Sequence, residues 1–197
     1  ALIYPLMLFL TAETVIQIAL PDLHVTWLCV TLLSVLYFTY CSEMWNQLDA
    51  LTGLLNQNSY LNRTAEMSRS SGLLIVFDVD NFKQVNDCYG HLQGDACLAA
   101  IAACLKKAYA CCGYCYRIGG DEFCVLLKNT AKEAACAEEF LRQLEKKRKE
   151  LTFLPTVSCG SAPLSGEDVV AVKDQADRAM YHHKKARKER AAAIVPE

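Results

Sequence analysis

The sequence predicts an α+β domain in which helices wrap a central, mostly antiparallel sheet, preceded by an N-terminal pair of apolar helices. Three observations indicate this fold. The run 73–78 is five apolar residues followed by an acid, as in a buried strand. Two further apolar runs, 114–118 and 123–127, flank a glycine pair, as in a hairpin. Amphipathic helical patterns separate these strands, which favours a sheet covered by helices.

Two apolar runs, 1–20 and 24–40, open the chain, and no Lys or Arg precedes Arg63. The second run has no Asp, Glu, Lys or Arg and approaches the ~20 residues that cross a bilayer. We therefore expect a transmembrane helical hairpin over residues 1–41, as part of a longer membrane region. A pair of buried helices in a dimerisation domain is the alternative. A signal peptide is disfavoured because a basic n-region is missing.

The charge and cysteine content exclude several classes of protein. A net charge of −2 over 197 residues favours neither nucleic acid nor bulk acidic substrates as partners. The 11 cysteines are scattered, odd in number and often set in apolar patterns, which is typical of reduced thiols used as small hydrophobic side chains. Cys112 and Cys115 form a single C-x-x-C beside Cys111, and a second pair at metal spacing is missing. Zinc or redox function is therefore disfavoured there.

Residues 42–48 are expected to form a connector helix, 49–192 one domain and 193–197 a tail. The elements expected in the domain are, in order, a helix capped by Asn56 or Asn58 and ending at Arg69, a strand 73–78, a helix 82–89, a turn 90–94, a helix from Asp95 to about Ala110, the hairpin strands 114–118 and 123–127, a helix 131–150, a strand 156–162 and a helix from Gly166 to about Arg190.

The hairpin turn carries two adjacent acids. Gly119 and Gly120 indicate a tight turn because residues without a Cβ can take φ > 0. Asp121 and Glu122 follow at once, and like charges side by side cost free energy unless a cation or a proton lies between them. A solvated acidic turn is the alternative to a functional site.

A second acidic feature ends the strand 73–78. If neighbouring strands bring Asp78 close to Asp121 or Glu122, their carboxylates form a site for a hard cation such as Mg²⁺. Two such ions could activate an attacking hydroxyl and neutralise a leaving pyrophosphate. Lys83 could offset charge on a transferring phosphoryl group. Neither a G-x-x-x-x-G-K-[ST] nor a G-x-G-x-x-G motif is present, which excludes P-loop and Rossmann sites.

Five segments together resemble the diguanylate cyclase, or GGDEF, family in order and spacing. They are DALTGLLN (49–56), FDVDNFKQVNDCYGHLQGD (77–95), RIGGDEF (117–123), SCG (158–160) and ADRAMYHHK (176–184). The resemblance covers residues 49–189 and implies a helix-wrapped sheet similar to the palm of polymerases.

The resemblance implies roles for individual residues. Asp78, the carbonyl of Val79, Asp121 and Glu122 would bind two Mg²⁺ or Mn²⁺ ions per active site. Asp121 would also act as general base for the ribose 3′-hydroxyl, and Lys83 would stabilise the transition state.

The remaining roles concern the substrate. Asn86 and Asp95 would read the guanine edge and favour GTP over ATP, with Phe82 and Leu92 as pocket wall. Lys184 and Lys188 would hold phosphates. The family has arginine at the Lys188 position, so this site keeps the charge but loses bidentate geometry. Residues 110–113 lack the family's R-x-x-D, so we expect no product feedback there.

The activity implied is condensation of two GTP into cyclic di-GMP and two pyrophosphates by a homodimer. The expected location is the bacterial cytoplasmic membrane, anchored through the N-terminal helices, with the catalytic domain in the cytosol and no nucleic-acid partner. Three alternatives stay open: a catalytically silent receptor for GTP or a cyclic dinucleotide, a scaffold that only dimerises, and a cyclic GMP-AMP synthase.

Overall fold

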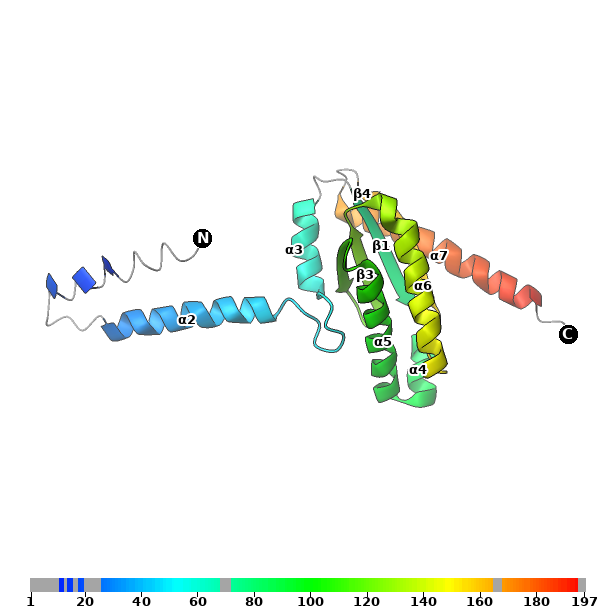
Figure 1. Cartoon of the computed structure of the whole chain (residues 1–197), viewed down its shortest axis with the longest axis horizontal. Helices are drawn as coiled ribbons and strands as arrows, with labels where there is room; N and C mark the ends of the chain where they lie inside the picture. The colour runs from blue at the N-terminus through cyan, green and yellow to red at the C-terminus, as the bar shows by residue number, and fades with distance from the viewer. Residues whose placement is uncertain are drawn as a thin grey trace. The chain divides into compact units, whose positions relative to one another are not determined.

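The computed structural model describes residues 11–12, 14–15, 18–19, 26–67, 72–164 and 168–194 (Figure 1). Internal contacts divide the chain into two compact units, Ala1–Asn46 and Gln47–Glu197. The division falls inside the expected connector 42–48.

The first unit contains α2 (Thr26–Trp45), whose described side chains include exposed Leu28, Leu36 and Phe38. Across the residues that the structure describes, no helix combines the length and the apolar character needed to span a membrane. The expected transmembrane hairpin is therefore not supported. Most of its first helix, 1–20, lies outside the described residues.

The second unit is built on a four-stranded sheet of order β2-β3-β1-β4 in which each neighbouring pair is antiparallel. The strands are β1 (Gly72–Val79), β2 (Gly113–Arg117), β3 (Glu122–Leu127) and β4 (Val157–Leu164). This confirms the predicted antiparallel sheet, with strand ends within two residues of those expected.

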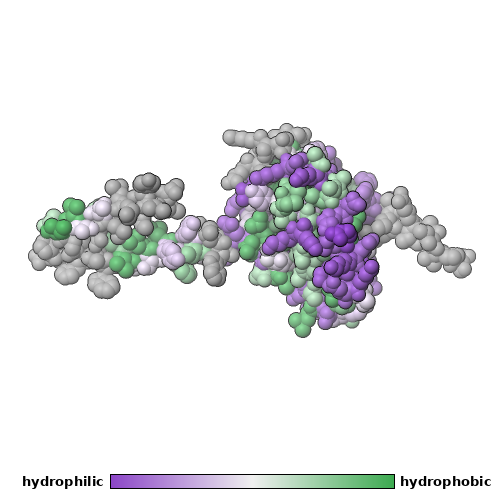
Figure 2. Space-filling model, in the orientation of Figure 1, coloured by the Kyte–Doolittle hydropathy of each residue, from purple (hydrophilic) through white to green (hydrophobic). Residues whose placement is uncertain are grey.

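Helices cover both faces of the sheet. α5 (His91–Tyr109) and α6 (Glu133–Glu150) lie side by side over one face, with α7 (Val169–Ile194) behind it (Figure 1). α3 (Gln57–Met67) packs beside α7, and the short η1 (Thr130–Lys132) leads into α6. Hydrophilic side chains gather over the outer face of α6 (Figure 2).

The alternation of β1 divides its apolar side chains between two cores. Ile75 and Phe77 join the core under α5 and α6, where the Phe77 ring lies 5.4 Å from that of Phe140. Leu74 and Val76 join the core under α3 and α7. Both faces of β1 are therefore buried, as its unbroken apolar run predicts.

α4, the helix after the first strand, has the expected bounds, whereas α5 begins at His91, four residues before the expected Asp95. α4 (Phe82–Tyr89) matches the prediction, and Gly90, at φ 84 and ψ 160, reverses the chain by itself. The expected turn 90–94 is therefore wrong. Gly94 lies inside α5, where a Cβ would overlap Oδ1 of Asn86. This glycine allows two helices to approach closely, and it does not break a helix.

The hairpin turn also differs from the expectation. Residues 118–121 join β2 to β3, and neither Gly119 nor Gly120 takes a positive φ. The backbone N–H groups of Ile118 and Gly119 both donate to the Glu122 carbonyl, at 3.0 and 3.4 Å. The loop is thus wider than a two-residue turn. The Glu122 side chain lies over Gly119, and a Cβ added to Gly119 would be 3.3 Å from it.

Segment 49–56 is fixed to the hairpin by a salt bridge. The Arg117 guanidinium donates to Oδ1 and Oδ2 of Asp49 at 3.1 and 3.3 Å and to the Gly120 carbonyl at 2.8 and 3.2 Å. Thr52 donates to the same Asp49 carboxylate from its N–H and its hydroxyl. Asn56 then caps α3 as predicted, because its Oδ1 accepts from the Ser59 N–H at 3.0 Å.

The packing of α7 on β4 generates a first prediction. A Cβ on Gly160 would overlap the Ala176 carbonyl and the backbone nitrogen of Met180. Gly160→Ala should therefore push α7 away from the sheet and lower the free energy of unfolding by about 1–3 kcal/mol. Gly120→Ala is the control, because nothing lies within 4 Å of its Cβ position. Equal urea midpoints for the two variants would contradict this account.

A second prediction concerns pH. Burial raises the pKa of Asp49, but the hydrogen bonds from Thr52 and Arg117 outweigh this and lower it below the ordinary 3.8. A lowered carboxyl pKa contributes stability above the unfolded value and loses it as pH falls through the folded value. Asp49→Asn should cost about 1–3 kcal/mol at neutral pH.

The cost of Asp49→Asn should then shrink as pH falls below about 4. Urea titrations from pH 7 to pH 3 measure it, with the exposed Asp174→Asn as the matched control. A cost that stays constant down to pH 3 would show that the Asp49 charge does not stabilise the fold.

Candidate functional site

Two carboxylates lie directly opposite each other at the end of the sheet. Asp78 of β1 pairs in register with Glu122 of β3 on one side and with Ser158 of β4 on the other. Opposed residues on antiparallel strands hold their Cβ atoms ~4.5–5.5 Å apart on the same face. Alternation along β1 places Asp78 on the face of Val76, which is the α7 face. The structure thus brings together the two acids that the sequence analysis expected to converge.

We refer to the end of the sheet that carries Asp78 and Glu122 as the acidic corner. Lys184 of α7 reaches this corner. Its ammonium donates a hydrogen bond to Oδ1 of Asp78 and lies 3.5 Å from Oδ1 of Asp80. Burial disfavours the charged lysine, but the Asp78 and Asp80 carboxylates outweigh this and raise the pKa of Lys184. Lys184 is therefore cationic at neutral pH and offsets the negative charge of the corner. The resemblance predicts for Lys184 only a phosphate contact.

Asp80 is a part of the site that the sequence analysis missed. It is only 4% exposed, and its two carboxylate oxygens accept hydrogen bonds from Thr156 and Ser158 at 2.7 and 2.8 Å. Its backbone N–H donates to the Thr156 carbonyl at 2.8 Å. The signal was its spacing: Asp80 follows Asp78 by two residues, so an extended chain presents both acids on the same face.

The hairpin loop is tied to the end of β1. The Val79 N–H donates to the Asp121 carbonyl at 3.2 Å, so the half-buried Asp121 lies beside the acidic strand end. Val79 itself is buried, at 1% exposure. Asp78, Val79, Asp121 and Glu122, the expected metal ligands, therefore come from two chain segments that lie next to each other.

The expected guanine-reading residues meet at the junction of α4 and α5. Asn86 is half-buried and contacts Gly94, and the exposed Asp95 follows Gly94 directly. Phe82 packs at the same junction, with its ring edge 3.3 Å from the Cβ position of Gly94. Leu92, the other expected wall residue, lies near the start of α5 with its side chain 84% exposed, and its role stays a prediction.

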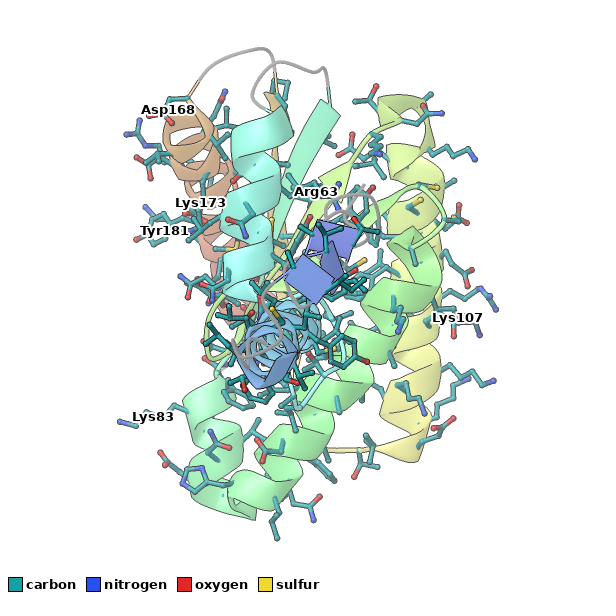
Figure 3. The ribbon with its side chains drawn as sticks, turned by 90° about the vertical axis from the view of Figure 1, so that its left-hand side faces the viewer. Arg63, Lys83, Lys107, Asp168, Lys173 and Tyr181 are labelled. Carbon is teal, nitrogen blue, oxygen red and sulfur yellow. The ribbon has the colours of Figure 1, made fainter. Side chains whose placement is uncertain are left out.

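The resemblance predicts that Lys83 stabilises the transition state and that Lys188 contacts phosphate. Lys83 is exposed and points outward from α4 (Figure 3). The side chain of Lys188 lies outside the described part of α7. Lys173, further up α7, pairs with Asp177 at 2.9 Å.

The acidic corner fits a magnesium ion by its donor chemistry. Within the described ranges, no three His, Cys, Asp or Glu side chains gather as a metal cluster. Mg²⁺ commonly takes only one or two protein carboxylates and fills its other positions with water and phosphate oxygens. Asp78 and Glu122 meet that requirement, and the ammonium of Lys184 shows that a cation is stabilised at this point.

Comparison with known proteins places this chain in a family. The family model described as "Diguanylate cyclase, GGDEF domain" matches residues 46–190. Diguanylate cyclase DgcP of Pseudomonas aeruginosa is 37% identical over 160 residues, which are 72% of this chain and 23% of DgcP. Cyclic di-GMP phosphodiesterase PdeR of Escherichia coli is 34% identical over 163 residues, which are 76% of this chain and 24% of PdeR.

A solved structure shares the fold. The GGDEF domain of DgcB from Caulobacter crescentus, in complex with c-di-GMP, matches with a TM-score of 0.61 and 27% identity, over 71% of this chain and 91% of that chain. The chain spans about a quarter of the length of DgcP and PdeR. Because the family model covers most of the sequence, including the acidic corner, the chain belongs to the GGDEF diguanylate cyclase domain family.

Proposed function

We propose that this chain is a diguanylate cyclase that condenses two GTP into cyclic di-GMP with release of two pyrophosphates. The observation that carries the proposal is the register of Asp78 against Glu122, beside Asp121 and under Lys184. A plain structural sheet end gains nothing from adjacent carboxylates, whereas phosphoryl transfer needs a cation-binding corner. The relatives named as diguanylate cyclases support the same activity.

The substrate would lie between the α4–α5 junction and the acidic corner. Guanine offers N1–H and a 2-amino group as donors, which the Asp95 carboxylate and the Asn86 amide oxygen can accept; adenine does not offer this pair. The triphosphate would then run toward Asp78 and Glu122. Lys184, now held by Asp78, would contact a phosphate oxygen, with Lys83 turned in from α4.

The reaction is attack of a ribose 3′-hydroxyl on an α-phosphate. When bound, Mg²⁺ or Mn²⁺ supplies charge neutralisation on the phosphates and lowers the pKa of the attacking hydroxyl. Asp121 would take the proton from that hydroxyl, since its loop is pinned to Val79 beside the carboxylate pair. Lys83 would offset negative charge that builds up in the transition state.

Each domain would bind one GTP, so two domains must face each other for both bonds to form. The salt bridge from Asp49 to Arg117 links the start of the second unit to the carbonyl of Gly120, one residue before Asp121. Segment 49–56 is therefore fixed to the loop that carries Asp121. Location at the bacterial cytoplasmic membrane stays a prediction from the apolar N-terminal residues, and fractionation of cells that produce the full chain tests it.

The activity assay is turnover of GTP with Mg²⁺, with products resolved by chromatography. We expect cyclic di-GMP from the full chain, at a rate per protein that rises with concentration because a dimer is required. Asp121→Asn should lower the rate by about 10²–10⁴-fold while GTP still binds. Asp87→Asn is the control for the same chemical change, because Asp87 is exposed on α4.

Two other outcomes would overturn the proposal. GTP binding without product, in both the parent chain and Asp87→Asn, would favour the receptor function instead. A mixed dinucleotide from an equimolar GTP and ATP mixture would favour a cyclic GMP-AMP synthase.

A further inference from the structure

Three cysteine sulfurs form a cluster at the opposite end of β2 from the acidic corner. Cys111 and Cys112 lie in the turn between α5 and β2, with their Sγ atoms 3.1 Å apart. Cys136, in the first turn of α6, places its Sγ 3.7 Å from that of Cys112. We refer to Cys111, Cys112 and Cys136 as the thiol cluster. Cys112 is its centre, because it contacts both of the others.

Covalent geometry decides which two sulfurs of the thiol cluster can bond without strain. Disulfide-bonded cysteines usually have Cα atoms ~4.4–6.8 Å apart. Adjacent residues joined by a trans peptide are held at ~3.8 Å, so a Cys111–Cys112 bridge falls short of that range. Cys136 is far from Cys112 in sequence and is not limited in this way. Its Sγ lies 3.7 Å from that of Cys112, which makes Cys112–Cys136 the favoured pair.

The three thiols differ in their exposure to solvent. Cys111 is exposed, Cys112 is half-buried and Cys136 is buried against the core. A small oxidant can thus reach Cys112 from solvent, while its partner is held in place by packing. The hydrogen bond with Cys112 raises the pKa of the Cys111 thiol. Cys111 therefore keeps its proton at neutral pH.

A fourth cysteine nearby serves as a comparison. Cys115 is buried, and its thiol donates to the Leu105 carbonyl at 3.7 Å. Burial raises its pKa to about 12, so Cys115 stays a protonated thiol at neutral pH. It lies in the same stretch of chain but does not belong to the thiol cluster.

We propose that the thiol cluster is a redox modification site at which a peroxide converts Cys112 and Cys136 into an intramolecular disulfide. The Cys112 thiolate attacks one oxygen of hydrogen peroxide, which breaks the O–O bond and gives a sulfenic acid and hydroxide. The Cys136 thiolate then attacks the Cys112 sulfur, and the sulfenic oxygen leaves as hydroxide. The protons given up by the two thiols convert the two hydroxides into water. Two thiols are oxidised and one peroxide is reduced to two waters.

The disulfide would close a loop that contains the catalytic hairpin. Residues 112–136 include β2, the loop 118–121, β3 and η1. The link would fasten the base of this hairpin to α6. A crosslink over about 25 residues restricts the unfolded chain, and we expect the thermal midpoint to rise by roughly 5–10 °C.

The test uses the full chain, first reduced and then treated with hydrogen peroxide, with remaining thiols blocked by an alkylating reagent. Trypsin releases residues 108–117, which carry Cys111, Cys112 and Cys115, and residues 133–142, which carry only Cys136. We expect the two peptides to be joined with the loss of two hydrogens, and fragmentation to place the bond at Cys112. The protein should lose two of its 11 free thiols, and dithiothreitol should restore them.

Serine variants test which cysteines form the disulfide. Cys112→Ser and Cys136→Ser should each abolish the joined peptides and the rise in thermal midpoint. Cys115→Ser should keep both, as should Cys88→Ser, which removes an exposed cysteine elsewhere. A bond placed at Cys111 or Cys115 in the parent chain would overturn the proposal, as would disulfides only between molecules. The parent measurement decides even if a variant fails to fold.

Discussion

The candidate functional site depends on the register of β1 between β3 and β4. Side chains alternate along a strand, so a slip of one residue moves each of them to the other face of the sheet. In the observed register Leu74 and Val76 fill the core under α3 and α7, and Asp78 continues their row to the sheet end beside Glu122. After a slip, Asp78 would face the core under α5 and α6. The two apolar cores therefore hold the carboxylates in position.

The acidic corner brings like charges together, which costs free energy that contacts from other parts of the fold offset. Asp78, Asp80 and Glu122 would repel one another if all were charged without a partner. Lys184 reaches two of them only because α7 crosses β4 in close contact at Gly160. Thr156 and Ser158, from β4, donate to Asp80 and complete its hydrogen bonding. The packing of α7 on the sheet thus brings the Lys184 ammonium to the corner. There a metal ion would compete with Lys184 for the Asp78 carboxylate, and nucleotide phosphates would compete with Asp78 for Lys184.

Much of this fold could be predicted from the sequence, because the strong signals are local. The unbroken apolar run of β1 and the short helical pattern of α4 predicted the ends of these two elements to within one residue. The convergence of Asp78 and Glu122 followed once two strand ends were assumed to be neighbours. Asp80 was missed because its hydrogen bonds come from hydroxyls 76 and 78 residues away, and its spacing from Asp78 was the one local signal.

Other errors came from glycine, whose role depends on what lies around it. Gly94 suggested a turn, yet it permits the close contact between α4 and α5. Gly119 and Gly120 suggested positive φ, but the loop is wide enough without it. Redox function was disfavoured for Cys112 and Cys115, and the contact with Cys136 could not be predicted, because Cys112 and Cys136 are 24 residues apart and meet only through the packing of α6. The apolar N-terminal runs predicted membrane helices, which the described residues do not support.

The most direct test of the central claim is binding of Mn²⁺ in place of Mg²⁺, measured from the loss of the free-ion signal in electron paramagnetic resonance. The full chain would be titrated in the presence of a non-hydrolysable GTP analogue. If Asp78 and Glu122 form the cation site, Asp78→Asn and Glu122→Gln should each weaken Mn²⁺ binding by at least about tenfold. The exposed Glu138→Gln, on α6, should leave it unchanged. Equal affinity in all four proteins would show that the paired carboxylates do not bind the metal.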